Sequence, residues 1–231
     1  MTLYELAVSS CFRRVLDLDT SFLKFMDKVD GALDVTRPEH REYLLCWLNE
    51  WGCRQFARDY HERASQEIRA WFRENGSSLP LLDSDLVDMG ESQCRDAAQC
   101  YGELVGRTAS IRSGGPVVIG PTGASKILFA VRPRALPPWD NAIMNTLGYD
   151  GLEESFLRFL LYARQLAQKL AKECTQRGFG LSELPGKLGR SATITVPKLI
   201  DEYHWITITR NVTLPTAADL KEWLSWSRGM R

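Results

Sequence analysis

The chain has 231 residues, of which 44% are hydrophobic and seven are tryptophan, enough apolar material for one large domain or two small ones with a core. This composition excludes an intrinsically disordered chain, and no run approaches the ~20 consecutive apolar residues of a membrane span. Its 29 basic and 29 acidic residues cancel, and the N-terminus lacks the features of a secretory signal, so we expect a cytoplasmic protein without membrane contact.

Residues 1–103 contain the patterns of several amphipathic helices. Thr2 and Glu5 form a capping box ahead of the first helix, and Thr36 and Glu39 form a second box ahead of another. The apolar side chains after the second box fall on one helical stripe: Tyr43, Leu44, Trp47, Leu48 and Trp51. This part of the chain carries 12 Lys and Arg residues against 19 Asp and Glu residues, a net charge of −7, so we expect an acidic helical layer.

Residues 104–231 carry 17 Lys and Arg residues against 10 Asp and Glu residues, a net charge of +7. Gly151–Arg177 has the longest helical pattern, with apolar residues on one side and basic residues on the other. β-Branched residues alternate within Ala192–Thr209, which favours a short β hairpin there. Thr216 and Asp219 precede a last helix. We therefore predict a mainly α fold with a short hairpin near 192–209, in which the acidic and basic parts form one compact unit.

The six cysteines show no CxxC pair and no regular spacing. They signal neither a zinc site nor a disulfide framework, and we expect them to be small buried hydrophobic residues. Three histidines without an HExxH motif also argue against a histidine-based metal site. The sequence therefore predicts neither a metal nor a cofactor.

The stretch from Leu104 to Trp139 contains no acidic residue. Its five basic residues are Arg107, Arg112, Lys126, Arg132 and Arg134. Such a surface favours an anionic partner, and phosphate is the obvious candidate. In an alternative interpretation, the basic half of the chain attracts the acidic half across an internal interface. The sequence leaves both interpretations open.

The segment from Val117 to Asp140 is the most informative part of the sequence. It reads VVIGPTGASKILFAVRPRALPPWD, a glycine turn, a helix with one lysine, and an aspartate after a proline-rich turn. Gly120 can adopt a positive φ and Gly123 permits close approach of the backbone, so N–H groups at the helix start are expected to face a DNA phosphate. Lys126 and Asp140 can face one cleft, where an amine attacks a sugar carbon and a carboxylate stabilises the developing positive charge.

This order of parts resembles the helix-hairpin-helix DNA glycosylase superfamily, over the segment from the glycine turn to the aspartate. The resemblance implies an all-α bilobal fold with DNA held at the hairpin. It also implies a damaged base flipped into the cleft between the lobes, and an aspartate at a helix N-terminus that supports glycosidic cleavage. In bifunctional members of the family, a lysine attacks the sugar. The iron–sulfur cluster of some members is excluded, because only Cys174 lies beyond residue 100.

Asp140 matches the family's aspartate, because it follows a proline and one large residue and opens the helix Asn141–Leu147. Gly120 matches the hairpin glycine. The family's lysine directly follows the hairpin; Thr122 holds that place here, and Lys126 lies four residues later on the same helical face. The resemblance thus implies Asp140 and Lys126 as the catalytic residues.

The resemblance also implies contacts with DNA around these two residues. The expected nucleic-acid-binding residues are Gly120, Thr122, Gly123, Arg107, Arg112, Arg132 and Arg134, with Trp139 stacking on the extruded base. We therefore expect a DNA glycosylase-like protein that acts on or binds damaged DNA, with DNA as its partner.

Each of these residues also has a structural interpretation. Asp140 is an ideal N-cap without catalysis, Lys126 can extend its ammonium to the surface, and Trp139 can fill the junction of two helices. A catalytically silent helical module that binds nucleic acid or a protein is therefore the alternative function. If Asp140 only caps, its carboxylate should bond to the backbone N–H of Ile143 or Met144 and be closed off from any cleft.

Two fainter patterns compete with this segment. Arg54 and His61 lie on one helix in a spacing loosely similar to the RNA-cleaving motif of HEPN-type ribonucleases, in which histidine performs acid–base catalysis. A structural role on an amphipathic helix is the commoner use of such a histidine. The run from Asp201 to His204 has groups that bind cations or exchange protons, but between two expected strands it favours a polar turn.

Overall fold

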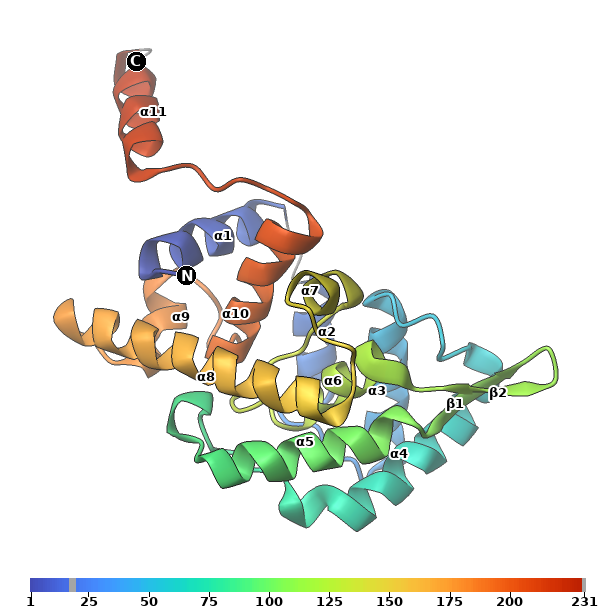
Figure 1. The fold of residues 1–231 in the computed structure, drawn as a ribbon. Coiled ribbons are helices and arrows are strands. Elements are labelled where there is room, and N and C mark those ends of the chain that lie inside the picture. Colours follow the sequence, from blue (N-terminus) through green and yellow to red (C-terminus); the bar gives the residue numbers. More distant parts are fainter. Residues whose placement is uncertain (17–19, 230–231) are drawn as a thin grey trace.

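The computed structural model describes residues 1–16 and 20–229, and this part of the chain is mainly helical (Figure 1). The first half contributes α1 (Leu3–Val15), α2 (Thr20–Lys28), α3 (Pro38–Glu50), α4 (His61–Asn75) and α5 (Glu91–Val105). The second half contributes α6 (Gly120–Val131), α7 (Asn141–Thr146), α8 (Glu153–Gln176), α9 (Leu184–Lys187), α10 (Val196–His204) and α11 (Ala217–Gly229). Strands β1 (Thr108–Arg112) and β2 (Gly115–Val118) form one antiparallel sheet. The prediction of a mainly α fold with a short hairpin is confirmed.

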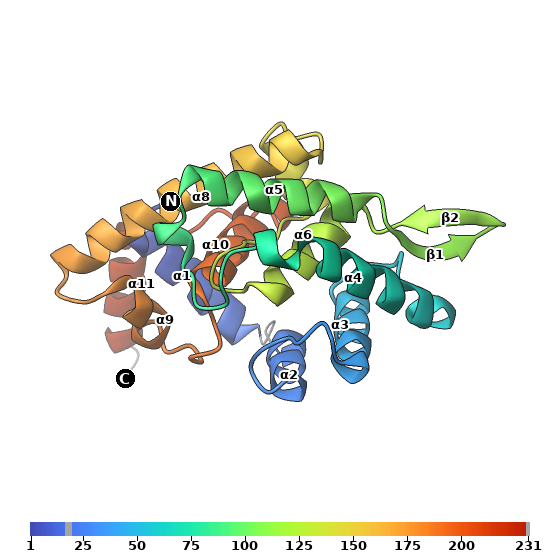
Figure 2. The ribbon, with the colours of Figure 1, turned by 90° about the horizontal axis from the view of Figure 1, so that it is seen from below.

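α6 is the central helix of the fold. Every residue from Gly123 to Val131 is buried, because α3 and α5 pack against it and α8 packs along α5 on the outside (Figures 1 and 2). One hydrophobic cluster runs from Leu3 to Ile200 and includes side chains from both halves of the chain. The acidic half and the basic half thus share one core.

The hairpin lies between α5 and α6 in the sequence; its strand β1 packs against α4, and its tip projects beyond the helices (Figure 1). Its two-residue turn consists of Ser113 and Gly114, with φ of 50° and 78°. Positive φ at both central positions gives a turn whose twist matches that of the strands, which explains why the chain reverses here. The hairpin expected near 192–209 was therefore predicted at the wrong place.

The segment 192–209 is helical rather than extended. α10 begins after Thr195, whose side chain accepts a hydrogen bond from the Lys198 backbone N–H, and Pro197 lies in its first turn. The β-branched run Trp205–Thr209 continues α10 as a π-helical turn. Propensity favoured a strand here, but capping and burial of one helical face against α1 and α8 outweigh the weak preference of β-branched residues.

The capping residues predicted from the sequence are found at the start of two helices and differ at the start of a third. Thr2 and Glu5 form the expected capping box of α1, and Thr216 and Asp219 bond to each other's backbone ahead of α11. α3 starts one residue later than expected, because Pro38 occupies its first turn and makes Arg37 the N-cap residue.

Three further features complete the description of the fold. Four of the six cysteines are buried, whereas Cys11 is exposed and Cys46 is half-buried. Across residues 1–16 and 20–229, no helix combines the length and the apolar character that a transmembrane segment requires. α11 buries none of its described side chains and stands apart from the other helices in Figure 1.

Candidate functional site

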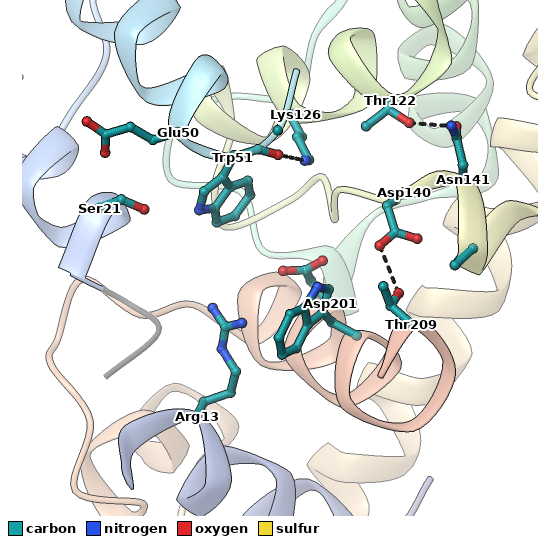
Figure 3. Close-up of a pocket in the computed structure, with 13 residues that line it drawn as sticks. Arg13, Ser21, Glu50, Trp51, Thr122, Lys126, Asp140, Asn141, Asp201 and Thr209 are labelled. Atoms are coloured by element: carbon teal, nitrogen blue, oxygen red, sulfur yellow. Dashed lines mark hydrogen bonds between the residues drawn. The ribbon is translucent and has the colours of Figure 1, made fainter. Parts of the chain in front are cut away.

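A cavity of about 630 Å³ opens where α1, α3, α6, α7 and α10 approach one another (Figure 3). It brings together side chains that are far apart in the sequence. Trp51 lies at the end of α3, Thr122 and Lys126 lie on α6, Asp140 precedes α7, and Asp201 lies on α10. The structure thus places three of the sequence-predicted site residues, Thr122, Lys126 and Asp140, in the wall of one cavity.

Lys126 is largely buried, because it projects from the central helix α6; only 9% of the residue is exposed. Its Nζ donates a hydrogen bond of 2.6 Å to the main-chain carbonyl of Trp51 and lies 5.2 Å from the centre of the Trp51 ring. That carbonyl belongs to the C-terminal end of α3, where the helix dipole attracts a cation. Lys126 therefore reaches the cavity one helical turn below Thr122, with its ammonium held at the wall.

Asp140 is the N-cap of α7 and lines the cavity at the same time. One carboxylate oxygen, Oδ1, accepts a hydrogen bond of 2.8 Å from the backbone N–H of Ile143. The other, Oδ2, accepts a hydrogen bond of 2.8 Å from the Thr209 hydroxyl (Figure 3). Each of the two expectations for Asp140 is therefore met only in part: the carboxylate caps α7 without being closed off, and it lines the cavity although both of its oxygens already have partners.

Thr209 reaches Asp140 from the π-helical turn Trp205–Thr209 that follows α10. Trp205 and Thr209 both line the cavity. π-Helical turns are rare, and they occur frequently at functional sites, where the widened turn redirects a side chain. The C-terminal part of the fold thus supplies one wall of the cavity and a direct contact with its aspartate.

A buried group of charged residues supports the α10 wall. Lys198 Nζ lies 3.0 Å from Asp201 and 3.2 Å from Glu202, and Arg190 lies 2.8 Å from Glu202. Burial acts to raise the pKa of Glu202, but the charges of Lys198 and Arg190 lower it to about 2. Lys198 Nζ also lies 4.9 Å from the centre of the Trp51 ring. Trp51 therefore contacts two ammonium groups, those of Lys126 and Lys198.

The cavity wall carries both signs of charge. Asp140, Asp201 and Glu50 contribute carboxylates, and Lys126 and Arg13 contribute cations. An amine and a carboxylate in the wall of one cavity suit nucleophilic attack combined with electrostatic stabilisation of a positive charge.

The two glycines of the α6 start have different roles. Gly120 has a φ of +69°, the left-handed conformation expected from the sequence. Gly123 allows the close approach of side chains from the loop after α3. A Cβ at Gly123 would lie 2.6 Å from Gln55 Nε2 and 3.3 Å from the Phe56 ring. The absence of a side chain at Gly123 therefore serves the tight internal packing of α6, and its contact with DNA stays a prediction.

Trp139 does not offer a stacking surface to a base. It is fully buried, with ring centres 5.0 to 5.8 Å from those of Tyr101, Phe156 and Phe159. Its indole N–H donates a hydrogen bond of 3.3 Å to the Pro121 carbonyl. Trp139 thus fills the junction between α6 and α8, as in its structural interpretation, because an aromatic ring surrounded by other rings gains more from burial than from exposure.

Two of the four arginines expected to bind phosphate form ion pairs with the acidic half of the chain. Arg107 contacts Glu74 and lies 3.8 Å from Glu67, both on α4. Arg134 lies 2.6 Å from Asp85. These pairs agree with the interpretation in which the two halves of the chain attract each other.

The other two arginines differ in exposure. Arg132 is half-buried, its Nε donates to the Pro80 carbonyl, and burial lowers its pKa. It anchors the turn after α6, and its contact with phosphate stays a prediction. Arg112 is exposed at the end of β1, and no ion pair with it occurs among residues 1–16 and 20–229.

The sequence patterns do not indicate several of the cavity residues. Trp51 falls on one helical stripe with apolar residues, and the run that contains Asp201 favours a polar turn between two strands. A helical interpretation of the segment after Thr195 puts Asp201, Trp205 and Thr209 four residues apart on one face, and all three line the cavity. The N-cap residue Thr195 is therefore the sequence signal from which these three cavity residues could have been predicted.

His61, the histidine of the ribonuclease interpretation, belongs to a separate group on α3 and α4. Ligand atoms of Glu42, Cys46 and His61 lie within 4.8 Å of one another, a spacing that could hold a metal ion. The Asn49 amide nitrogen, however, donates to the Phe56 carbonyl and faces His61 Nε2 at 3.2 Å. Nε2 is therefore the acceptor, and Nδ1 carries the proton that it donates to Glu42 at 2.8 Å. Both ring nitrogens thus have partners within the protein, so a metal ion at this group would have to displace the Nδ1 proton, and acid–base catalysis would have to displace Asn49 or Glu42.

Comparison with known proteins finds no relative of this chain. The chain matches no protein-family model, no curated protein and no solved structure.

Proposed function

We propose that this protein is a DNA glycosylase-like enzyme in which Asp140 and Lys126 act on one nucleotide inside the cavity. The observation that carries the proposal is the convergence of these two side chains, from different elements, on one cavity of about 630 Å³. Sites for small ligands have volumes of this order. The resemblance of Val117–Asp140 to the helix-hairpin-helix DNA glycosylases supports the same reaction.

In the proposed reaction, the bond between the sugar C1′ and the base nitrogen breaks. The bonding electrons leave with the base, and positive charge develops at C1′ and the ring oxygen. The Asp140 carboxylate stabilises this charge. Its two direct partners, the Ile143 N–H and the Thr209 hydroxyl, are neutral donors, so they orient the carboxylate without cancelling its charge.

Lys126 is the proposed nucleophile. Its ammonium gives up a proton to the departing base, and the free amine forms a bond to C1′ in place of the base. The C1′–O4′ bond then breaks, O4′ takes one proton from the attached nitrogen and becomes a hydroxyl, and a protonated imine remains between Lys126 Nζ and C1′, which borohydride reduces to a stable amine. Because the ammonium is bonded to the Trp51 carbonyl at rest, the substrate has to displace this hydrogen bond before attack.

Other residues in and around the cavity suit a nucleic-acid substrate. The Trp51 and Trp205 indoles line the cavity. Lys126 and Lys198 lie over the Trp51 ring, and Arg13 and Arg210 lie over the Trp205 ring, so a base has to displace one of these cations in order to stack. Gly120 and Thr122 at the start of α6 are proposed to contact the DNA backbone, and the exposed Arg112 on the hairpin adds a positive charge.

A catalytically silent module that binds nucleic acid or a protein is the second candidate. Two observations favour it: both oxygens of Asp140 accept hydrogen bonds within the protein, and the Lys126 ammonium already has a carbonyl partner. Pairing of Arg107 and Arg134 with acidic residues also reduces the positive charge that is available for DNA.

Borohydride trapping distinguishes the two candidates. The protein is incubated with duplexes that carry an abasic site, an oxidised base or an alkylated base, and released base is measured in the same reactions. We expect a covalent adduct with the wild-type chain and none with Lys126→Ala. Lys172→Ala, which alters an exposed lysine on α8, is the matched control and should form the adduct normally.

Asp140→Asn separates catalysis from binding. The amide keeps an oxygen that can cap α7 but loses the charge, so base release should fall by about a hundredfold or more while DNA affinity is retained. Equal loss of binding and base release would count against a catalytic Asp140. No adduct and no released base on any duplex would favour the silent module.

A further inference from the structure

The two oxygens of the Asp140 carboxylate are held from different parts of the chain. Oδ1 is fixed locally by the Ile143 N–H, three residues away. A single hydrogen bond leaves the carboxylate free to turn, because the terminal torsion of an aspartate is soft. The hydroxyl of Thr209, 69 residues away in sequence, bonds to Oδ2 at 2.8 Å and fixes the plane of the group.

The position of Thr209 depends on the π-helical turn. The Arg210 N–H donates to the Trp205 carbonyl at 2.8 Å, across five residues, so the turn is wider than that of an α-helix. The turn is anchored by Ile206, which is 2% exposed, and by the Thr207 hydroxyl, which donates to the Tyr203 carbonyl at 2.8 Å. A widened turn kept in place by buried contacts is a feature that proteins retain mostly where it serves a site.

The chemistry of the contact suits a catalytic carboxylate. A hydroxyl that donates to a charged acceptor forms one of the stronger hydrogen bonds in proteins. Thr209 carries no charge, so it orients the carboxylate and leaves its negative charge intact. A lysine or arginine at the same place would form an ion pair and weaken the field at the sugar.

We infer that Thr209 is a positioning residue, which holds the Asp140 carboxylate in the orientation that glycosidic cleavage requires; this inference rests on the proposed function. The π-helical turn is thereby part of the active site, although it contacts the reacting atoms only through Asp140.

The test compares Thr209→Val, which removes the hydroxyl at nearly the same shape, with Thr209→Ser, which retains it. We expect single-turnover base release to fall by about tenfold in Thr209→Val and to stay near wild type in Thr209→Ser, with DNA affinity unchanged in both.

Thr175→Val is the matched control, since it removes a threonine hydroxyl that donates to the Ala171 carbonyl on α8, away from the cavity. It should keep the wild-type rate. If Thr209→Val and Thr175→Val behave alike while the wild-type chain releases base, the inference about Thr209 is wrong and the proposed function stands. If the wild-type chain releases no base, the proposed function is wrong and the inference is overturned with it.

Discussion

Trp51 contacts two of the charged groups around the cavity. Its ring lies near the ammonium groups of Lys126 and Lys198, at 5.2 and 4.9 Å, and its carbonyl accepts a hydrogen bond from Lys126. The negative face of an indole attracts such cations. One residue at the end of α3 thus links α6 and α10, and it holds the proposed nucleophile in its resting position.

His204, next to the π-helical turn, makes the stability of the protein sensitive to acid. Burial lowers its pKa from 6.5 to about 4. Between these values the unfolded chain binds a proton that the folded chain does not, so the free energy of unfolding should fall by roughly 3 kcal/mol as the pH drops from 6.5 to 4. Urea unfolding at a series of pH values measures this slope. His204→Gln, which does not titrate, should flatten it, and an equally steep profile in that variant would exclude His204 as the cause.

At the scale of elements, α6 positions the site because it is buried on all sides. A helix covered by α3, α5 and the Gln55–Phe56 loop cannot rotate or slide without opening the core. The packing of α6 against its neighbours therefore determines that Thr122 and Lys126 lie at the cavity; contacts inside the cavity are not needed for this.

Gly123→Ala tests how closely α6 is packed. The added Cβ lies 2.6 Å from Gln55 Nε2, which donates to the Ile119 carbonyl at 2.7 Å, so this hydrogen bond must shift. We expect the free energy of unfolding to fall by about 1 to 2 kcal/mol, measured by chemical denaturation. Gly106→Ala, where the new Cβ meets no atom within 4 Å, is the control. Equal stability of the two variants would contradict close packing at Gly123.

At the scale of the whole molecule, some of the opposite charges of the two halves form ion pairs with each other. Arg107 and Arg134 pair with Glu74 and Asp85 across the boundary between the halves. The halves also share one hydrophobic cluster. The two halves are therefore held together by ion pairs as well as by a common core. Only some of the basic residues that the structure describes in the second half remain unpaired and able to bind an anionic partner.

The buried group around Glu202 joins the two ends of the chain. Arg190 bonds to Glu202 and also to the Ser10 hydroxyl on α1, at 2.6 Å. Glu202→Gln would leave Arg190 and Lys198 buried with too little negative charge, so we expect the free energy of unfolding to fall by about 3 kcal/mol. Glu91→Gln, which breaks an exposed pair on α5, should leave the thermal midpoint almost unchanged. Similar midpoints for both variants would show that the buried group contributes little to stability.

The local features of this protein follow from its sequence. Short-range rules, which involve residues within one or two helical turns, identify the capping box of Thr2 and Glu5 and the N-cap position of Asp140. They also place a left-handed glycine at Gly120 and put Thr122 and Lys126 on one helical face. Each of these features depends on backbone geometry that a few neighbouring residues determine.

The tertiary structure alone decided which distant side chains meet. Packing turned the β-branched run Trp205–Thr209 into a helical turn that brings Thr209 to Asp140. It buried Trp139 among other rings and left Arg112 exposed. Burial and charge pairing between residues far apart in the chain outweigh local propensities of a few tenths of a kcal/mol per residue, and no local pattern in the sequence records them.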